Sequence, residues 1–135
     1  ALYYYYETLK INPKYDPAYV HAGNVLQNMG KLDDAINCYL KALRINNKSA
    51  EAQYNLGIAL ILKNRFPEAI NHFTESLKIN PDDADVHNNL GIALIKTGKI
   101  KEGLGHFQQS LHLNPDNLEF QKNVSIALNM VKNSR

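Results

Sequence analysis

The sequence predicts an all-α protein in which pairs of antiparallel helices repeat and stack into an elongated solenoid. Three observations support this fold class. The string NLGIALI occurs at 55–61 and again at 89–95, and the related strings HAGNVLQ and NVSIALN occupy 21–27 and 123–129, always at an offset of 34 residues. Small and aromatic residues recur in phase with this offset, and turn residues separate the segments. A period of this length indicates a repeated helix-turn-helix unit.

The helices follow from the apolar spacing and from the breaks between segments. They are expected over about residues 17–29, 33–46, 51–63, 67–80, 85–97, 101–113 and 118–132. In the second helix of each unit, apolar residues are spaced i, i+3, i+7 and so form one face. These stripes are Ile36, Tyr39 and Leu43, then Ile70, Phe73 and Leu77, then Leu104, Phe107 and Leu111.

The connections between the helices agree with this assignment. Gly30 and Gly98 stand where the first helix of a unit must turn, and Asn64 takes that place in the middle unit. Gly and then Asn are the residues that best tolerate a left-handed backbone. Pro67 falls in the first turn of its helix, where a missing N–H costs least.

The recurring columns resemble the tetratricopeptide repeat, whose units are helix pairs of 34 residues. With units numbered from Asp16, Ala50, Ala84 and Leu118, each family column falls on similar residues. Position 8 holds Gly23, Gly57, Gly91 and Ser125; position 20 holds Ala35, Ala69 and Gly103; position 24 holds Tyr39, Phe73 and Phe107; position 27 holds Ala42, Ser76 and Ser110; position 32 holds Asn47, Pro81 and Pro115. Small residues at positions 8, 20 and 27 allow the two helices of a unit to approach closely.

The resemblance implies three complete repeats at 16–49, 50–83 and 84–117. Residues 1–15 would be the second helix, helix B, of a truncated repeat, and 118–135 a first helix, helix A, or capping helix. It also implies a right-handed superhelix that holds a peptide or partner protein in a concave groove lined by the A helices. The chain would then be a protein-interaction scaffold.

The amino-acid composition argues against several other classes of protein. The formal charge is +2, from 15 basic and 13 acidic residues without a basic block, which argues against nucleic-acid binding. The single cysteine, Cys38, excludes an intrachain disulfide. No apolar run approaches the roughly 18 residues of a membrane span, so no direct membrane contact is expected.

Without an initiator methionine or signal peptide, the chain reads as a segment of a longer protein. The compartment stays open, with a soluble cytoplasmic segment as the expectation.

The residues do not indicate an enzyme, a metal site or a cofactor. Cys38, His72 and His106 share repeat position 23. Equivalent positions in stacked units lie about 8–10 Å apart, whereas zinc needs its ligands about 2 Å from one centre. These three residues are therefore predicted to be variable positions on the outer surface. Ser76, Ser110 and Ser125 belong to the small-residue columns of the core, and no phosphate-binding loop is present.

The candidate peptide-binding groove lies on the face formed by positions 2, 5, 6, 9, 12 and 13 of the A helices. An asparagine column at position 6 can donate to and accept from a peptide backbone. It is similar to the asparagine ladder of O-linked N-acetylglucosamine transferases, so a substrate-recruiting domain of a larger enzyme such as a glycosyltransferase is an alternative. The predicted groove residues are Asn24, Tyr54, Asn55, Ile58, Ile61, Asn89, Ile92, Ile95 and Asn123.

Two questions about these residues stay open. The asparagines can grip a ligand or link neighbouring helices, and the isoleucine stripe, which Ile126 extends, can be an exposed patch or core. A third question concerns the acids at position 2, Glu51, Asp85 and Glu119. The helix macrodipole favours acids in a first turn, with ligand recognition as the alternative.

Other ligand modes of helical repeats fit less well. The family's carboxylate clamp needs basic residues where this chain has Val20, Asp85 and Asn89. RNA-reading repeats need phosphate-neutralising cations, and this face offers only Lys96 and Lys122.

Self-association is a further alternative. The chain begins at repeat position 20 and ends at position 18, so the last helix A of one molecule could dock on the first helix B of another. A polar cap is the competing interpretation of the last helix, favoured by Lys122, Asn129, Lys132 and Asn133. Of the four tyrosines at 3–6, Tyr5 occupies position 24 and is predicted to be a core aromatic, and the other three are not required by the fold.

Overall fold

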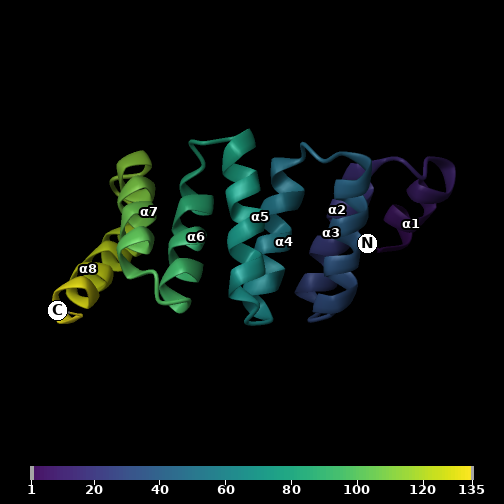
Figure 1. Ribbon diagram of the computed structural model, residues 1–135. Helices are drawn as coiled ribbons and strands as arrows, with labels where there is room; N and C mark the ends of the chain where they lie inside the picture. Colours follow the sequence, from purple (N-terminus) through teal and green to yellow (C-terminus); the bar gives the residue numbers. More distant parts are fainter. Residues whose placement is uncertain (1, 135) are drawn as a thin grey trace.

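In the computed structural model, which describes residues 2–134, the chain is an all-α solenoid (Figure 1). Its helices run in sequence order along one axis, with antiparallel neighbours. They are α1 (Leu2–Ile11), α2 (Asp16–Asn28), α3 (Leu32–Ile45), α4 (Ala50–Leu62), α5 (Phe66–Ile79), α6 (Ala84–Lys96), α7 (Ile100–Leu113) and α8 (Leu118–Asn133). The seven predicted helices are confirmed to within one residue at each end. Ala1 and Arg135, the outermost residues of the predicted flanking half-units, lie outside the described residues.

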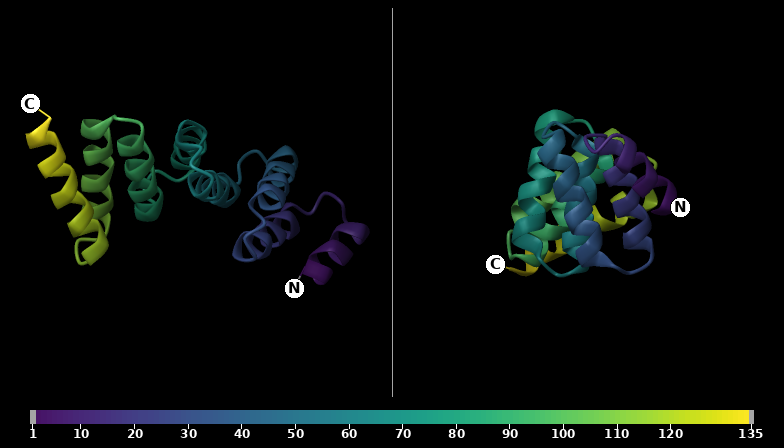
Figure 2. Two further views of the ribbon diagram at one scale, coloured as in Figure 1. Left: turned by 90° about the horizontal axis from the view of Figure 1, so that it is seen from below. Right: turned by 90° about the vertical axis from the view of Figure 1, so that its right-hand side faces the viewer.

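The helices pair as the sequence predicts. The A helices α2, α4 and α6 pack most extensively on the B helices that follow them, α3, α5 and α7, and each pair stacks on the next. The two further views show the pairs stepping along the axis with a progressive twist (Figure 2). The core is therefore a continuous layer between the A and B helices.

The closest approach within a pair joins a glycine of helix A to an aromatic ring of helix B. A Cβ added to Gly57 would lie 2.5 Å from Cε1 of Phe73, and Gly23 meets Tyr39 at the same distance. The rings of Tyr39 and Phe73 are fully buried. The small-residue column thus leaves the space that the aromatic column fills.

The turns confirm the predicted left-handed residues. Gly30 and Gly98 have φ of 78° and 87°, and Asn64 has φ of 59°. In each case the next amide donates to a carbonyl five residues back, as from Arg65 to Leu60 at 2.8 Å, which closes the helix end. Pro67 lies in the first turn of α5, as predicted.

The flanking helices are less buried than the register suggested. α1 contains no buried residue, and Tyr5 is half-buried, with its ring stacked on His21 at a centroid distance of 5.4 Å. The prediction of Tyr5 as a core aromatic was wrong, because the described residues include no helix A to cover its other side. Ser125, predicted for the core, is exposed on α8 for the corresponding reason, whereas Ser76 and Ser110 are buried.

Candidate peptide-binding groove

The A helices form the inner side of the solenoid. α2 contacts α4 and α4 contacts α6 directly, whereas no contact of similar extent joins α3 to α5 or α5 to α7 in residues 2–134. Neighbours that are closer on one side than on the other make a stack curve toward the closer side. The predicted groove residues therefore lie on the inner, A-helix side.

The position-6 asparagines form hydrogen bonds between neighbouring A helices. Asn55 Nδ2 donates to Asn24 Oδ1 at 3.1 Å, and Asn89 Nδ2 donates to the Tyr54 hydroxyl at 3.0 Å. Asn123 Nδ2 donates to Asn88 Oδ1 at 2.8 Å. The linking role that the sequence left open is thus present in every step from α2 to α8.

These hydrogen bonds use the N–H donors of the asparagine side chains and leave the side-chain oxygens of the same residues without a donor in residues 2–134. Asn89 also donates to the main-chain oxygen of Asp85 at 3.0 Å, so both of its N–H groups are engaged. None of the hydrogen bonds within residues 2–134 uses Oδ1 of Asn55, Asn89 or Asn123 as the acceptor. The side-chain oxygens of Asn55, Asn89 and Asn123, which we call the amide ladder, remain to accept a hydrogen bond from another molecule.

Two partners in this network, Tyr39 and Asn88, were not among the nine predicted groove residues, although Asn88 occupies position 5 of the predicted face. The Tyr39 hydroxyl donates to Asn24 Oδ1 at 2.6 Å, reaching it from α3 through the pair interface. Asn88 is only 4% exposed and accepts from Asn123. Tyr39 was interpreted only as a core aromatic, and its sole distinguishing signal is a hydroxyl where the next units carry Phe73 and Phe107.

Tyr54 lies at the centre of this face. Its ring is half-buried against Phe73, with 5.9 Å between centroids. Burial raises the pKa of the Tyr54 hydroxyl, and the nearby acids Asp85 and Asp83 raise it further. The phenol therefore keeps its proton at neutral pH and can donate it to a ligand while accepting from Asn89.

The isoleucine stripe is neither fully core nor fully exposed. Ile58, Ile61, Ile92 and Ile95 are each half-buried, and Ile126 is 46% exposed. Ile58 and Ile61 pack on the core cluster with their inner atoms. Ile58, Ile92 and Ile126 follow the asparagine of their helix by three residues, so their outer parts offer apolar surface beside the amide oxygens. Ile95 instead packs against α7, where a Cβ added to Gly103 would lie 2.6 Å from Cγ1 of Ile95.

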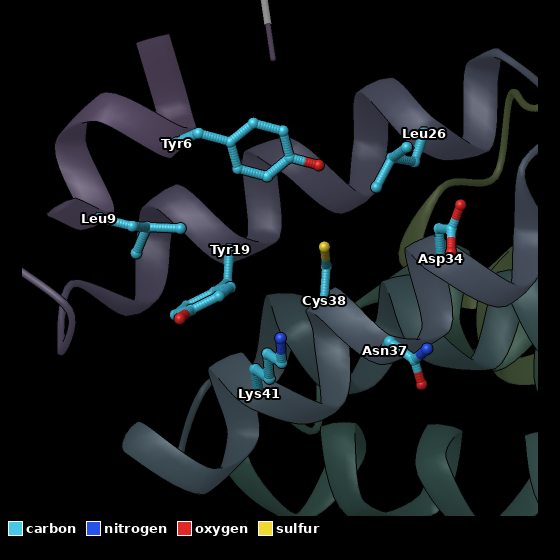
Figure 3. Close-up of a pocket in the computed structure, with 8 residues that line it drawn as sticks. All are labelled: Tyr6, Leu9, Tyr19, Leu26, Asp34, Asn37, Cys38 and Lys41. Atoms are coloured by element: carbon cyan, nitrogen blue, oxygen red, sulfur yellow. The ribbon is translucent and has the colours of Figure 1, made fainter. Parts of the chain in front are cut away.

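The opposite, B-helix side carries notches between successive B helices. The first has a volume of about 460 Å³ and is bounded by α1, α2 and α3 (Figure 3). The Cys38 thiol points into it on the side of Tyr6, and the Lys41 ammonium group lies 5.9 Å from the centroid of the Tyr19 ring. Burial raises the pKa of the Cys38 thiol, so the thiol stays protonated and is a weak nucleophile.

The equivalent places in the next two units are bridged by hydrogen bonds. His72 Nδ1 lies 2.8 Å from Gln53 Oε1, and His106 Nδ1 lies 3.0 Å from His87 Nδ1 with the two rings stacked. Cys38, His72 and His106 are half-buried, so the prediction of outer-surface positions was wrong. Position 23 faces helix A of its own unit, which the columns alone did not reveal. No group of three or more potential metal ligands is brought together within residues 2–134.

Two family models match the chain. A model described as TPR repeat covers residues 23–62 and 59–98, and one described as tetratricopeptide repeat covers 84–117. The chain therefore belongs to the tetratricopeptide repeat family. No helix in the described part of the chain is long and apolar enough to cross a membrane.

Solved structures share the fold. The structure of MamA superposes with a TM-score of 0.91 at 21% identity, covering 97% of this chain and 77% of MamA. YrrB, described as a TPR protein with an unusual peptide-binding site, gives 0.89 at 25% identity, covering 95% of this chain and 66% of YrrB. The first TPR of Spaghetti (RPAP3), bound to the HSP90 peptide SRMEEVD, gives 0.85 at 20% identity, covering 87% and 93%. No curated protein matches the sequence.

Proposed function

We propose that the chain is a protein-interaction scaffold that binds an extended peptide segment of a partner along its concave face. The row of amide oxygens on Asn55, Asn89 and Asn123 carries this proposal, because main-chain N–H groups of an extended segment are their natural donors. The half-buried isoleucines beside them supply apolar contact. YrrB and RPAP3, which share the fold, bind peptides according to their descriptions.

The spacing of the A helices sets the length of the ligand. Packed helices are about 8–10 Å apart, and an extended chain advances about 3.3 Å per residue. Each repeat then corresponds to about three ligand residues. A ligand that reaches all three amide oxygens needs about seven to ten residues.

The ligand differs in chemistry from the acidic peptide held by RPAP3. The clamp positions of the family hold Val20, Asp85 and Asn89 here, so no cation stands ready for a terminal carboxylate. SRMEEVD is therefore a suitable negative-control peptide. The proposed role is recruitment rather than catalysis; within a larger enzyme the same groove would deliver that enzyme's substrate.

A pair of substitutions in α4 tests the groove. Asn55→Ala removes the bond to Asn24 and the ladder oxygen, whereas Gln53→Ala removes the bond to His72 on the other side of the same helix. Each should lower stability by about 1 kcal/mol. A fluorescent ten-residue peptide selected from a random library should bind Asn55→Ala about five- to tenfold more weakly than wild type, and Gln53→Ala equally well. Equal binding by both variants, or equal loss in both, would contradict the groove.

Head-to-tail association is the second candidate, because both flanking helices expose apolar side chains. Leu128 on α8 is 47% exposed, whereas Leu26, Leu60 and Leu94 at the same repeat position are 4%, 2% and 3% exposed. On α1, Tyr3, Tyr4 and Tyr6 are exposed. One residue opposes this docking: Ser125 carries a Cβ where the complete pairs have glycine, and a Cβ added to those glycines would lie 2.5–2.6 Å from the ring.

Sedimentation equilibrium distinguishes head-to-tail association from a monomer. The average mass should rise with protein concentration, Leu128→Asp should abolish the rise, and Ser125→Gly should strengthen it by making room for Tyr5. A mass that stays monomeric up to about millimolar concentration, which corresponds to about −4 kcal/mol, would eliminate this candidate.

A further inference from the structure

Three acids line one edge of the candidate groove. Glu51, Asp85 and Glu119 lie in the first turns of α4, α6 and α8, and all three are exposed. Each precedes the ladder asparagine of its helix by four residues, which places acid and amide on the same helical face. The side chain of Asn89 donates to the main-chain oxygen of Asp85, one turn before it, at 3.0 Å.

These groove acids have no cationic partner within residues 2–134, as is also true of six other acids of the chain. The ion pairs within residues 2–134 join Lys10 to Glu7, Lys63 to Asp33, Arg65 to Glu68 and Lys78 to Glu75. None of them involves a groove acid. The negative charge along this edge is therefore not neutralised by a neighbouring side chain.

One of the three acids, Glu119, accepts a hydrogen bond on the groove face in addition to lying at its helix end. Asn88, buried in the groove wall, donates to Glu119 Oε1 at 3.5 Å. Asp85, Asp83 and Glu119 all help to raise the pKa of the Tyr54 hydroxyl, after the larger effect of burial. Their charge thus reaches the centre of the groove.

Of the two cations of this face, Lys96 lies far from the acidic edge and Lys122 lies near one end of it. Lys96 lies in the last turn of α6, eleven residues from Asp85 and so about 16 Å along the helix axis. Lys122 follows Glu119 by one turn on α8. The acidic edge is consequently least opposed between Glu51 and Asp85.

We infer that the occupant of the groove is a basic segment in the extended polyproline II conformation, in which every third residue shares a face, with Lys or Arg at those places pairing with Glu51, Asp85 and Glu119. This inference rests on the proposed function and names the class of its ligand. The segment's main-chain N–H groups reach the ladder oxygens while its basic side chains turn to the acidic edge. A phosphate backbone or an acidic peptide would be repelled by the same edge.

Two matched peptides test the inference by fluorescence anisotropy. One is a labelled ten-residue peptide with Lys at its second, fifth and eighth positions and alanine or serine elsewhere; the other carries Glu at those places. The Lys peptide should bind at least tenfold more tightly at about 0.02 M salt, and the difference should shrink at about 0.15 M. Equal binding of the two peptides would overturn the inference.

Two triple variants distinguish binding by the groove acids from attraction by the net charge of the protein. The groove variant combines Glu51→Gln, Asp85→Asn and Glu119→Gln, and the control combines Asp34→Asn, Glu75→Gln and Glu102→Gln, one in each B helix. Both remove the same charge. The groove variant should bind the Lys peptide about tenfold more weakly, and the control within about twofold of wild type. Equal weakening in both triples would mean attraction by net charge alone, which contradicts the inference.

Failure of this inference is distinguishable from failure of the groove. If Asn55→Ala weakens a library-selected peptide while the groove triple does not alter Lys-peptide binding, the groove stands and its acids serve only the helix ends. Circular dichroism of the groove triple ensures that a change in binding is not a change in folding.

Discussion

Single residues decide how closely each helix pair packs. The glycine column of the A helices meets aromatic rings of the B helices, and a methyl group in place of the glycine hydrogen would overlap the ring. Overpacking of this kind costs about 1–3 kcal/mol. The same substitution on an open helix face has the opposite sign, because Ala is the better helix former by about 1 kcal/mol.

Gly57→Ala should therefore destabilise the chain by about 1–3 kcal/mol. Its matched control is Gly105→Ala in α7, where an added Cβ meets nothing within 4 Å. That control should stabilise by up to about 1 kcal/mol. Urea denaturation of both variants measures the change in the free energy of unfolding. An increase in Gly57→Ala would contradict the packing described.

The histidines at position 23 predict a pH dependence of stability. Burial lowers the pKa of His72 and of His106, with His87 lowering the latter further. The folded state therefore binds fewer protons than the unfolded state as pH falls through the ordinary imidazole pKa of about 6.5. The free energy of unfolding is therefore lower below that pH than above it.

Thermal melts at about pH 7.5 and about pH 5.5 should show this loss as a lower midpoint in acid. The double variant His72→Gln and His106→Gln should show a smaller drop, and exposed His112→Gln should behave as wild type. An undiminished drop in the double variant would assign the pH effect to other groups.

At the scale of the helices, the helix ends could be predicted from the sequence. The left-handed residue after helix A was recognised from Gly30, Gly98 and Asn64 because only few residue types tolerate that backbone. The packing columns were recognised for a similar reason, since the closest contact admits only glycine. Position 23 and Tyr5 were misjudged, because their burial depends on which helix covers them. The donors and acceptors of the amide ladder depend on side-chain conformations that the repeat pattern does not encode.

Asn64→Gly should raise the free energy of unfolding by a few tenths to about 1 kcal/mol, since Gly adopts a positive φ without steric cost. The same change at Asn71, exposed within α5, should lower it by about 0.5 kcal/mol. Chemical denaturation of the two variants gives the comparison. Destabilisation at both sites would show that the left-handed conformation of Asn64 is not strained.

At the scale of the whole molecule, no contact within residues 2–134 joins one end of the solenoid to the other. Each pair contacts mainly its neighbours, so local stability should follow the number of neighbours that each helix has. Large, fully buried side chains extend from Tyr39 on α3 through Leu56, Leu60 and Phe73 to Phe120 on α8. α1 contains no buried residue, and α8 contains only Phe120 and Ala127.

Amide hydrogen exchange should accordingly be slowest in α4, α5 and α6 and fastest in α1, with α8 intermediate. Leu60→Ala should cost about 2–5 kcal/mol and accelerate exchange in the middle units. The exposed Leu62→Ala serves as the control and should leave exchange nearly unchanged. Uniform protection from α1 to α8 would instead indicate a single cooperative unit.

Amide chemical shifts on titration with a library-selected ten-residue peptide test the concave groove most directly. The amides that shift should cluster on the inner faces of α4, α6 and α8, and the side-chain amides of Asn55, Asn89 and Asn123 should shift with them. α3, α5 and α7 should stay nearly unchanged. Shifts concentrated on these B helices, around the notch lined by Cys38 and Lys41, would contradict a peptide groove on the concave face.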